Sequence, residues 1–325
     1  MVVNRFIKSK NAVAAGVSYF KSRIRKKSSI SVMPVAVGIE ISGLCNLRCP
    51  ECSCGSGIMT RKGGLMDIGL YKKIILELRP YLYHINLYFQ GEPMLHPQFF
   101  EFLDESVEIK NTVSTNGHYL SEENSLKLAR SGLSKIIISL DGMDEETYSM
   151  YRQGGEFEKV VRGIRNVSQE IRRTGSSLKL EIQFLVNRHN EGQIHSVRRF
   201  SEEVGATLRL KSMQIINKEH FENWLPGSEK FKRYKKDETD FKIKSSMNNH
   251  CLRLWLNPVI TWDGKVVPCC FDKNADHILG DLKKDTFRTI WHGEQYRMFR
   301  DSVLTHRKEI GICRNCTSGL RGVIY

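Results

Sequence analysis

The sequence predicts an α/β fold with a parallel sheet, followed by a small cysteine-rich region. Six strand-like segments alternate with five helical segments between residues 35 and 215. Several of the strands run into polar or glycine-containing turns. The nine cysteines fall into two sets, one in the loop after the first strand and one after residue 250. Because crossover helices return the chain to the same edge, this alternation indicates parallel strands.

Short β-type runs that end in turn residues mark the strands. The six expected strands are 35–42, 84–90, 111–117, 135–142, 177–186 and 207–215. Helical periodicity and capping residues mark the segments between them. The five expected helices are 66–82, 97–108, 121–132, 154–175 and 193–205. Sites gather at the carboxyl ends of parallel strands, so the turns after the first four strands are expected to face one pocket.

The character of the chain changes after residue 216. Residues 217–248 are charged and have little periodicity, which is typical of a linker or bridging segment. Residues 249–325 hold the other five cysteines. The predicted organisation is an extension at 1–34, a core domain at 35–216, the linker, and a C-terminal domain at 249–325.

The N-terminal extension is strongly basic. Residues 1–30 carry eight Lys or Arg and no acid, within a chain of formal net charge +14. Val13, Val17, Phe20 and Ile24 recur at helical spacing. A basic amphipathic helix suits an anionic membrane surface or an acidic partner. The simpler interpretation is a solvated helix packed on the main domain.

Hydropathy and cysteine usage indicate a cytoplasmic protein, with peripheral membrane contact left open by the basic extension. No apolar run reaches about 18 residues, so no transmembrane helix is expected. The stretch "AVAAGV" is too short for a secretory signal. Reducing conditions in the cytosol favour metal or redox roles for clustered cysteines, and nine is an odd count for a disulfide framework.

The first cysteine set is Cys45-x3-Cys49-x2-Cys52. Three thiolates bind three corners of a [4Fe–4S] cluster and leave one iron for substrate or cofactor, since complete ligation takes four cysteines. A zinc site would instead pair its ligands at two places. Cys54 as a fourth ligand keeps a zinc interpretation open.

Three further motifs follow the cysteine loop at the ends of successive strands: "GEP" (91–93), "STNG" (114–117) and "SLDG" (139–142). Together with the loop, they resemble the radical S-adenosylmethionine (SAM) enzymes. The resemblance covers about residues 35–215 and implies a partial (β/α)6 barrel. It also implies that the open iron chelates SAM. One electron then cleaves SAM to methionine and a 5′-deoxyadenosyl radical, which abstracts hydrogen from substrate. A reductant such as flavodoxin or ferredoxin is implied as a partner.

The same resemblance implies a set of SAM contacts. The "GEP" segment would hold the methionine amino group, and carbonyls and a carboxylate suit an ammonium ion. The implied contacts are Gly91, Glu92, Pro93, Ser114, Thr115, Asn116, Ser139, Asp141 and, on the fifth strand, Gln183. Two positions depart from the family's pattern, because Gln90 stands before "GEP" and Glu51 before the third cysteine.

The second cysteine set resembles a SPASM or twitch module, which holds an auxiliary [4Fe–4S] cluster. A hairpin turning at Asp263-Gly264 and a helical segment at 279–300 accompany it. Four cysteines complete the ligation, which suits electron transfer. The implied ligands are Cys251, Cys269, Cys313 and Cys316. The glycine spacing favours Cys269 over Cys270, and structural zinc is the alternative for paired cysteines.

These features predict a radical SAM oxidoreductase whose auxiliary cluster accepts an electron from the substrate. Relatives with short modules act on small molecules. A peptide-modifying SPASM maturase is the alternative, although 34 residues are too few for a peptide-recognition domain and a separate recognition protein would be needed. A zinc-stabilised nucleic-acid binder is a third hypothesis, prompted by the net charge of +14. Nucleic acid is not expected, since the basic residues do not interleave with aromatics near the cysteines.

Arg152, beyond the fourth strand, is a candidate substrate ligand. Its guanidinium could hold a carboxylate or a phosphate. The alternative is a surface salt bridge with the acids at 144–146.

Overall fold

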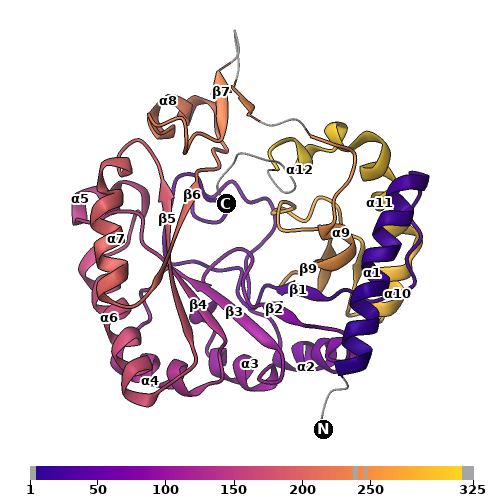
Figure 1. The fold of residues 1–325 in the computed structure, drawn as a ribbon, viewed down its shortest axis with the longest axis horizontal. Coiled ribbons are helices and arrows are strands. Elements are labelled where there is room, and N and C mark those ends of the chain that lie inside the picture. The colour runs from indigo at the N-terminus through magenta and orange to yellow at the C-terminus, as the bar shows by residue number, and fades with distance from the viewer. Residues whose placement is uncertain (1–4, 237–240, 245–246, 317–325) are drawn as a thin grey trace.

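The computed structural model describes residues 5–236, 241–244 and 247–316 (Figure 1). Six parallel strands form its centre: β1 (Ala36–Ile39), β2 (His84–Asn86), β3 (Lys110–Thr115), β4 (Lys135–Ser139), β5 (Lys179–Val186) and β6 (Thr207–Ser212). They pair in chain order and curve into an open barrel with helices outside. The predicted fold class is confirmed.

Five helices cross between these strands as the periodicity predicts. They are α2 (Ile68–Leu78), α3 (Phe99–Glu105), α4 (Glu122–Arg130), α6 (Phe157–Thr174) and α7 (Ile194–Glu203). Asp67 and Ser121 cap α2 and α4 by accepting backbone N–H bonds. One helix was not expected, α5 (Glu145–Tyr151), which is short and begins at the capping residue Asp144.

Successive side chains of each strand point alternately into the barrel and outward to the core beneath the helices. On β4, Ile136 and Ile138 are fully buried in that core, whereas Ile137 and Ser139 point to the opposite face. Ser139 is paired in register with Gln183 on β5, so both side chains lie on the interior face. Polar residues at these positions therefore line the inside of the barrel.

The C-terminal hairpin extends the same sheet. Its strands are β9 (Val259–Ile260), β10 (Lys265–Val267) and β11 (Gly280–Asp281). The predicted turn is present, with Gly264 at φ +87°, where a side chain would be strained. β9 pairs in parallel with β1, at Gly38–Val259 and Ile39–Ile260. The C-terminal cysteine region is thus attached to the barrel by backbone hydrogen bonds.

Helices α9 (Arg253–Leu256), α10 (Phe287–His292), α11 (Glu294–His306) and α12 (Gly311–Arg314) complete this region. The single helical segment expected at 279–300 is wrong, because β11 takes its start and Gly293 separates α10 from α11. Arg300 is fully buried in their core. Its guanidinium carbon lies 3.9 Å from the ring centre of Tyr296 and 4.3 Å from that of Trp291. These cation–π contacts compensate in part for burying a charge.

Between barrel and C-terminal region lie α8 (Phe221–Trp224) and the antiparallel pair β7 (Tyr234–Lys236) and β8 (Phe241–Ile243). At the other end of the chain, α1 (Arg5–Arg25) runs along the outside of the C-terminal region (Figure 1). The boundaries 1–34, 35–216, 217–248 and 249–325 stay a prediction. Among the described residues, no helix is both long and apolar enough to cross a bilayer.

Candidate active site

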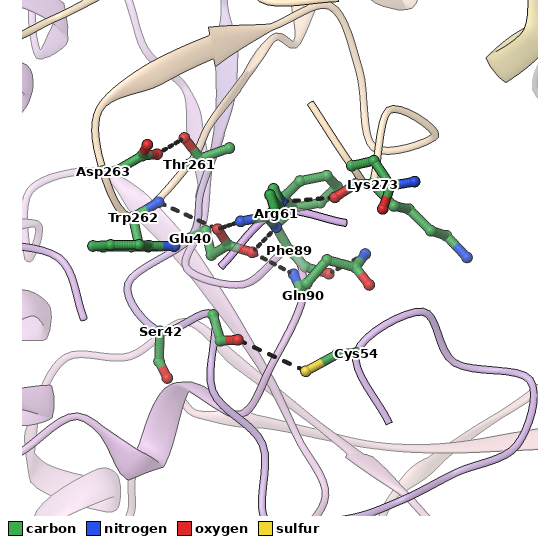
Figure 2. A network of polar contacts seen from close by, with 12 residues as sticks. Glu40, Ser42, Cys54, Arg61, Phe89, Gln90, Thr261, Trp262, Asp263 and Lys273 are labelled. Atoms are coloured by element: carbon green, nitrogen blue, oxygen red, sulfur yellow. Dashed lines mark hydrogen bonds and ion pairs between the residues drawn. The ribbon is translucent and has the colours of Figure 1, made fainter. Parts of the chain in front are cut away.

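A buried ion pair fixes the first cysteine loop at both ends (Figure 2). Glu40 follows β1 and is fully buried, and Arg61 lies at the far end of the loop. The guanidinium donates from Nη1 to Oε2 over 2.7 Å and from Nη2 to Oε1 over 2.5 Å. The backbone N–H groups of Gln90 and Trp262 donate to the same carboxylate. Burial raises the pKa of Glu40, and these donors oppose the shift.

The C-terminal hairpin packs directly on this loop. The Trp262 ring lies so close to Gly64 and Gly43 that a Cβ there would come within 2.6 and 2.9 Å of ring atoms. Arg61 Nε also donates to the carbonyl of Lys273 over 2.7 Å. Glycine is therefore required where the loop meets the indole.

The three thiols of the predicted cluster lie close together in the loop. Burial is the main cause that raises the pKa of Cys45 and the pKa of Cys49, the latter to about 11, and the neighbouring Cys52 contributes to both increases. Arg152 Nη1 approaches Cys49 Sγ at 3.9 Å, and Asn116 Nδ2 approaches Cys45 Sγ at 4.0 Å. Three converging thiols with cationic and amide donors around them fit a cluster ligated at three corners.

Cys54 differs from the other three thiols. It donates to the carbonyl of Gly43 over 3.7 Å, as Figure 2 shows, and burial raises its pKa to about 12. Its thiol therefore already has an acceptor within the loop.

Two contacts tie the middle of the loop to the barrel. The N–H of Arg48 donates to the carbonyl of Gln153 over 2.8 Å. Glu51 accepts from the N–H of Ile216 at 2.5 Å and lies 2.5 Å from Nδ1 of His220. Glu51, one of the two positions that depart from the family's pattern, therefore anchors the loop to the segment after β6.

The "GEP" segment meets the end of β3. Gly91 has φ +73°, and a Cβ there would lie 2.6 Å from the Ser42 carbonyl oxygen. The Glu92 carboxylate accepts from Thr115 Oγ1 and the Asn116 N–H, each at 2.7 Å. Burial raises the pKa of Glu92, and these bonds oppose the shift. Gly91 thus brings the segment against the cysteine loop, and Glu92 joins β2 to β3.

Three predicted SAM contacts face the barrel interior with free polar groups. Among the described residues, the side chains of Ser114, Ser139 and Gln183 make no hydrogen bond to protein. Ser114 is in register with Ile137, which shares its face with Ser139. Asn116 is partly engaged, because Nδ2 donates to Asn46 Oδ1 over 2.8 Å. These groups are available to a polar ligand beside the cysteine loop.

Asp141 and Arg152 differ from the sequence interpretation. Arg152 donates to Asp141 Oδ2 at 2.5 Å from Nη2 and 2.7 Å from Nε. Asp141 Oδ1 accepts from the N–H of Leu185 at 2.6 Å. The expected surface salt bridge with the acids at 144–146 is wrong, because the Arg152 side chain is 14% exposed and pairs with Asp141. The pair therefore joins the ends of β4 and β5 beside the cysteine loop, and the roles of Asp141 and Arg152 as ligand contacts stay a prediction.

The second cysteine set also converges. Burial raises the pKa of Cys269, and its neighbours Cys270, Cys251 and Cys316 raise it further. Burial raises the pKa of Cys313 to about 11, with Cys316 and Cys251 nearby. The four predicted ligands thus lie in one region of the C-terminal domain, and their ligation of a single cluster stays a prediction.

Cys270 differs from the four predicted ligands in its contacts. It accepts from Arg253 Nη1 at 2.8 Å. Burial raises the pKa of Tyr88, which follows β2, to about 12, and Cys270 is the main charged group that adds to this increase. Among residues 5–236, 241–244 and 247–316, no three His, Cys, Asp or Glu side chains are grouped so as to hold one metal ion. A cluster needs a wider arrangement, since each thiolate binds a different iron.

Two lysines missed by the sequence analysis lie between the cysteine sets. Lys211 on β6 and Lys273 after the hairpin both have a pKa lowered by burial, and Cys270 is near each of them. Strand alternation could have found Lys211, because Leu208 and Leu210 pack toward the helices. Lys273 had no such signal, since it lies in an irregular turn.

Two family models match the chain. The Radical SAM superfamily model matches residues 39–180, which include the first cysteine loop. The SPASM model, an iron-sulfur cluster-binding domain, matches residues 251–317. The chain belongs to the radical SAM superfamily and has a C-terminal SPASM domain. Its radical SAM domain binds a [4Fe–4S] cluster and SAM, and its SPASM domain binds auxiliary iron–sulfur clusters, which confirms the predicted cofactors.

Similar sequences include enzymes of different activity. The mycofactocin maturase MftC of Mycobacterium ulcerans is 30% identical over 184 residues, or 56% of this chain and 48% of that protein. The chain therefore matches about half the length of this relative. The AdoMet-dependent heme synthase of Methanosarcina barkeri is 24% identical over 333 positions, covering 90% of this chain and 92% of the relative.

Solved structures share the fold. BtrN in complex with AdoMet and 2-DOIA has a TM-score of 0.56 and 19% identity, covering 89% of this chain and 95% of that one. Streptococcus suis SuiB bound to its precursor peptide SuiA has a TM-score of 0.64 and 15% identity, covering 91% and 73%. At these identities the likeness describes architecture.

Replacing Arg61 with Ala is expected to lower the free energy of unfolding by about 3–5 kcal/mol, because Glu40 is left charged and buried without its partner. The double replacement Glu40→Gln/Arg61→Met should cost clearly less. Urea unfolding under anaerobic conditions measures both.

A matched control for this prediction is Lys72→Ala, which removes an exposed pair with Glu101. It should cost under about 1 kcal/mol. Equal, small costs for Arg61→Ala and Lys72→Ala would contradict a structural role for the buried pair.

Proposed function

We propose that this chain is a radical SAM oxidoreductase in which the SPASM cluster accepts an electron from the substrate. Cys45, Cys49 and Cys52 would hold the cluster that binds SAM, which supplies a hydrogen-abstracting radical when bound. Overall, the substrate would lose a hydrogen atom to the 5′-deoxyadenosyl radical, which becomes 5′-deoxyadenosine, then a proton to a base and an electron to the second cluster. The balance is a two-electron oxidation.

The observation that carries this proposal is the pair of arginines beside the second cysteine set. Arg253 donates to Cys270 at 2.8 Å, and Arg307 Nη2 approaches Cys316 Sγ at 3.8 Å. Nearby thiolates raise the pKa of Arg253, with Cys270 the main cause. Positive charge close to a cluster stabilises its reduced form. Such a cluster is suited to accepting an electron.

The SAM site is proposed to lie between the cysteine loop and the strand ends. The backbone of Gly91, Glu92 and Pro93 would face the methionine amino group, and Ser114, Ser139 and Gln183 would offer free polar groups. Thr115, Asn116 and Asp141 would position these elements, because their side chains already bond to Glu92, Asn46 and Arg152.

The substrate is proposed to carry a carboxylate or a phosphate. Lys211 and Lys273 would attract it, since each is half-buried and neither makes a side-chain hydrogen bond within the described residues. Arg209 and Lys135, on the same interior face, already pair with Glu181. The excess of positive charge inside the barrel suits a negatively charged molecule.

A second candidate is modification of a peptide. Its support is the 30% identity with mycofactocin maturases over 184 residues and the shared fold with SuiB. The interior basic groups would then hold an acidic side chain or a carboxyl terminus.

The reduced, reconstituted chain is expected to cleave SAM to 5′-deoxyadenosine. Cys45→Ala/Cys49→Ala/Cys52→Ala should fall to the protein-free background, whereas Cys54→Ala, from the same loop, should retain cleavage. Cys313→Ala/Cys316→Ala should still cleave SAM but lose substrate oxidation. Chromatography of the nucleoside measures cleavage. No cleavage by the wild type refutes the radical function, and intact turnover by the last variant refutes the electron-acceptor role alone.

Replacing Arg253 with Met is expected to shift the midpoint potential of the SPASM cluster to more negative values by tens of millivolts, where about 59 mV is tenfold for one electron. The loss of a neighbouring positive charge is the reason. Arg165→Met removes an exposed arginine and serves as control. A redox titration followed by electron paramagnetic resonance measures both, and an unshifted Arg253→Met cluster would contradict the argument.

Deuterium transfer from the substrate distinguishes a small anionic substrate from a peptide substrate. An extract of cells grown in D2O is divided by ultrafiltration and then by anion exchange, and each fraction is incubated with the reduced protein and SAM. We expect deuterium to enter 5′-deoxyadenosine with the small, anionic fraction. Transfer confined to the retained macromolecules would favour the peptide candidate.

A further inference from the structure

Helix α1 buries its polar face against the protein and exposes its apolar face to solvent. Its buried residues are largely polar, and include Asn11, Ser18 and Ser22. Its apolar side chains Val13, Val17, Phe20 and Ile24 are 70%, 47%, 58% and 81% exposed. These four, which we call the outer stripe, lie on one face at helical spacing. An amphipathic helix normally turns that face to the core.

Hydrogen bonds to the body of the protein fix this orientation. Asn11 donates from Nδ2 to the Met33 carbonyl at 2.8 Å and accepts from the Met33 N–H at 3.0 Å. Ser18 donates to the carbonyl of Ser29 at 2.5 Å, and Tyr19 OH lies 2.9 Å from His250 Nδ1. Turning the outer stripe inward would break all of these contacts. The helix is therefore held so that its apolar face meets whatever lies outside.

Positive charge borders the outer stripe. Lys10 and Lys21 line a shallow groove of about 670 Å³ along it, together with Val13 and Val17. Arg23, Arg25, Lys26 and Lys27 are exposed at the end of the helix. The first acidic residue of the chain is Glu40. The face thus combines exposed apolar side chains with a concentration of cations.

We propose that α1 docks on an anionic membrane surface, with the outer stripe among the lipid chains and the lysines and arginines at the headgroups. An isolated apolar patch would suit many partners, but apolar side chains ringed by cations match an anionic bilayer in both respects. A second copy of the chain would bring two strongly basic helices together. Because the helix is fixed to the SPASM side of the molecule (Figure 1), docking would orient the whole enzyme.

The test is sedimentation of the full chain with vesicles. Wild type should bind vesicles of equal parts phosphatidylglycerol and phosphatidylcholine, and bind them less as salt rises. Val13→Gln/Phe20→Gln/Ile24→Gln should weaken binding about tenfold or more, since burying one such side chain contributes on that order. Leu76→Gln, at an exposed apolar position of α2, is the matched control and should bind like wild type. Far-UV circular dichroism and iron content show whether each variant is folded.

Several results would overturn the proposal. If the wild type does not bind anionic vesicles, or binds vesicles of phosphatidylcholine alone equally well, an anionic membrane surface is excluded as the partner. Unchanged binding by the folded triple variant excludes the outer stripe. A dimer that the triple variant disrupts, with no vesicle binding, would assign the stripe to a second copy. None of these outcomes depends on the proposed oxidation.

Discussion

The rest of the structure depends on the buried pair of Glu40 and Arg61. The carboxylate stands at the end of β1, and the guanidinium closes the cysteine loop and reaches the Lys273 carbonyl. Through Trp262 the same carboxylate holds the SPASM hairpin. These donors compensate for the cost of burying the Glu40 carboxylate, but removal of Arg61 would leave a buried charge without its partner. One interaction thereby sets the position of both cysteine sets relative to the barrel.

Charge is distributed around the thiols in a way that suits two clusters of different roles. Burial, together with neighbouring thiols, raises the pKa of Cys49 to about 11 and that of Cys313 to about 11, whereas a cluster binds the thiolate form. Iron must therefore displace protons as it binds. Arg152 faces Cys49, whereas Arg253 and Arg307 face the second set. Two arginines beside the second set suit the electron-acceptor role that we propose for it.

Local patterns in the sequence predict the strands and helices of the barrel because β-branched runs and helical periodicity are local properties. They do not predict that β9 pairs with β1, since Gly38 and Val259 are brought together only in the folded chain. Periodicity predicts α1 and its apolar stripe, but the bonds of Asn11 to Met33 decide which face is buried. Likewise, a motif implies a SAM contact at Asp141, but it does not predict the ion pair of Asp141 with Arg152, which only the folded chain brings together.

The most direct test of this account is the iron and sulfide content of the anaerobically purified protein and of two cysteine variants. The account predicts about eight irons per chain, and about four in both Cys45→Ala/Cys49→Ala/Cys52→Ala and Cys313→Ala/Cys316→Ala. Each variant would then retain the cluster that its intact cysteines hold. Zinc without iron, unchanged by anaerobic reconstitution, or an iron content that does not respond to one of the two sets, would contradict the central claim of two separate clusters.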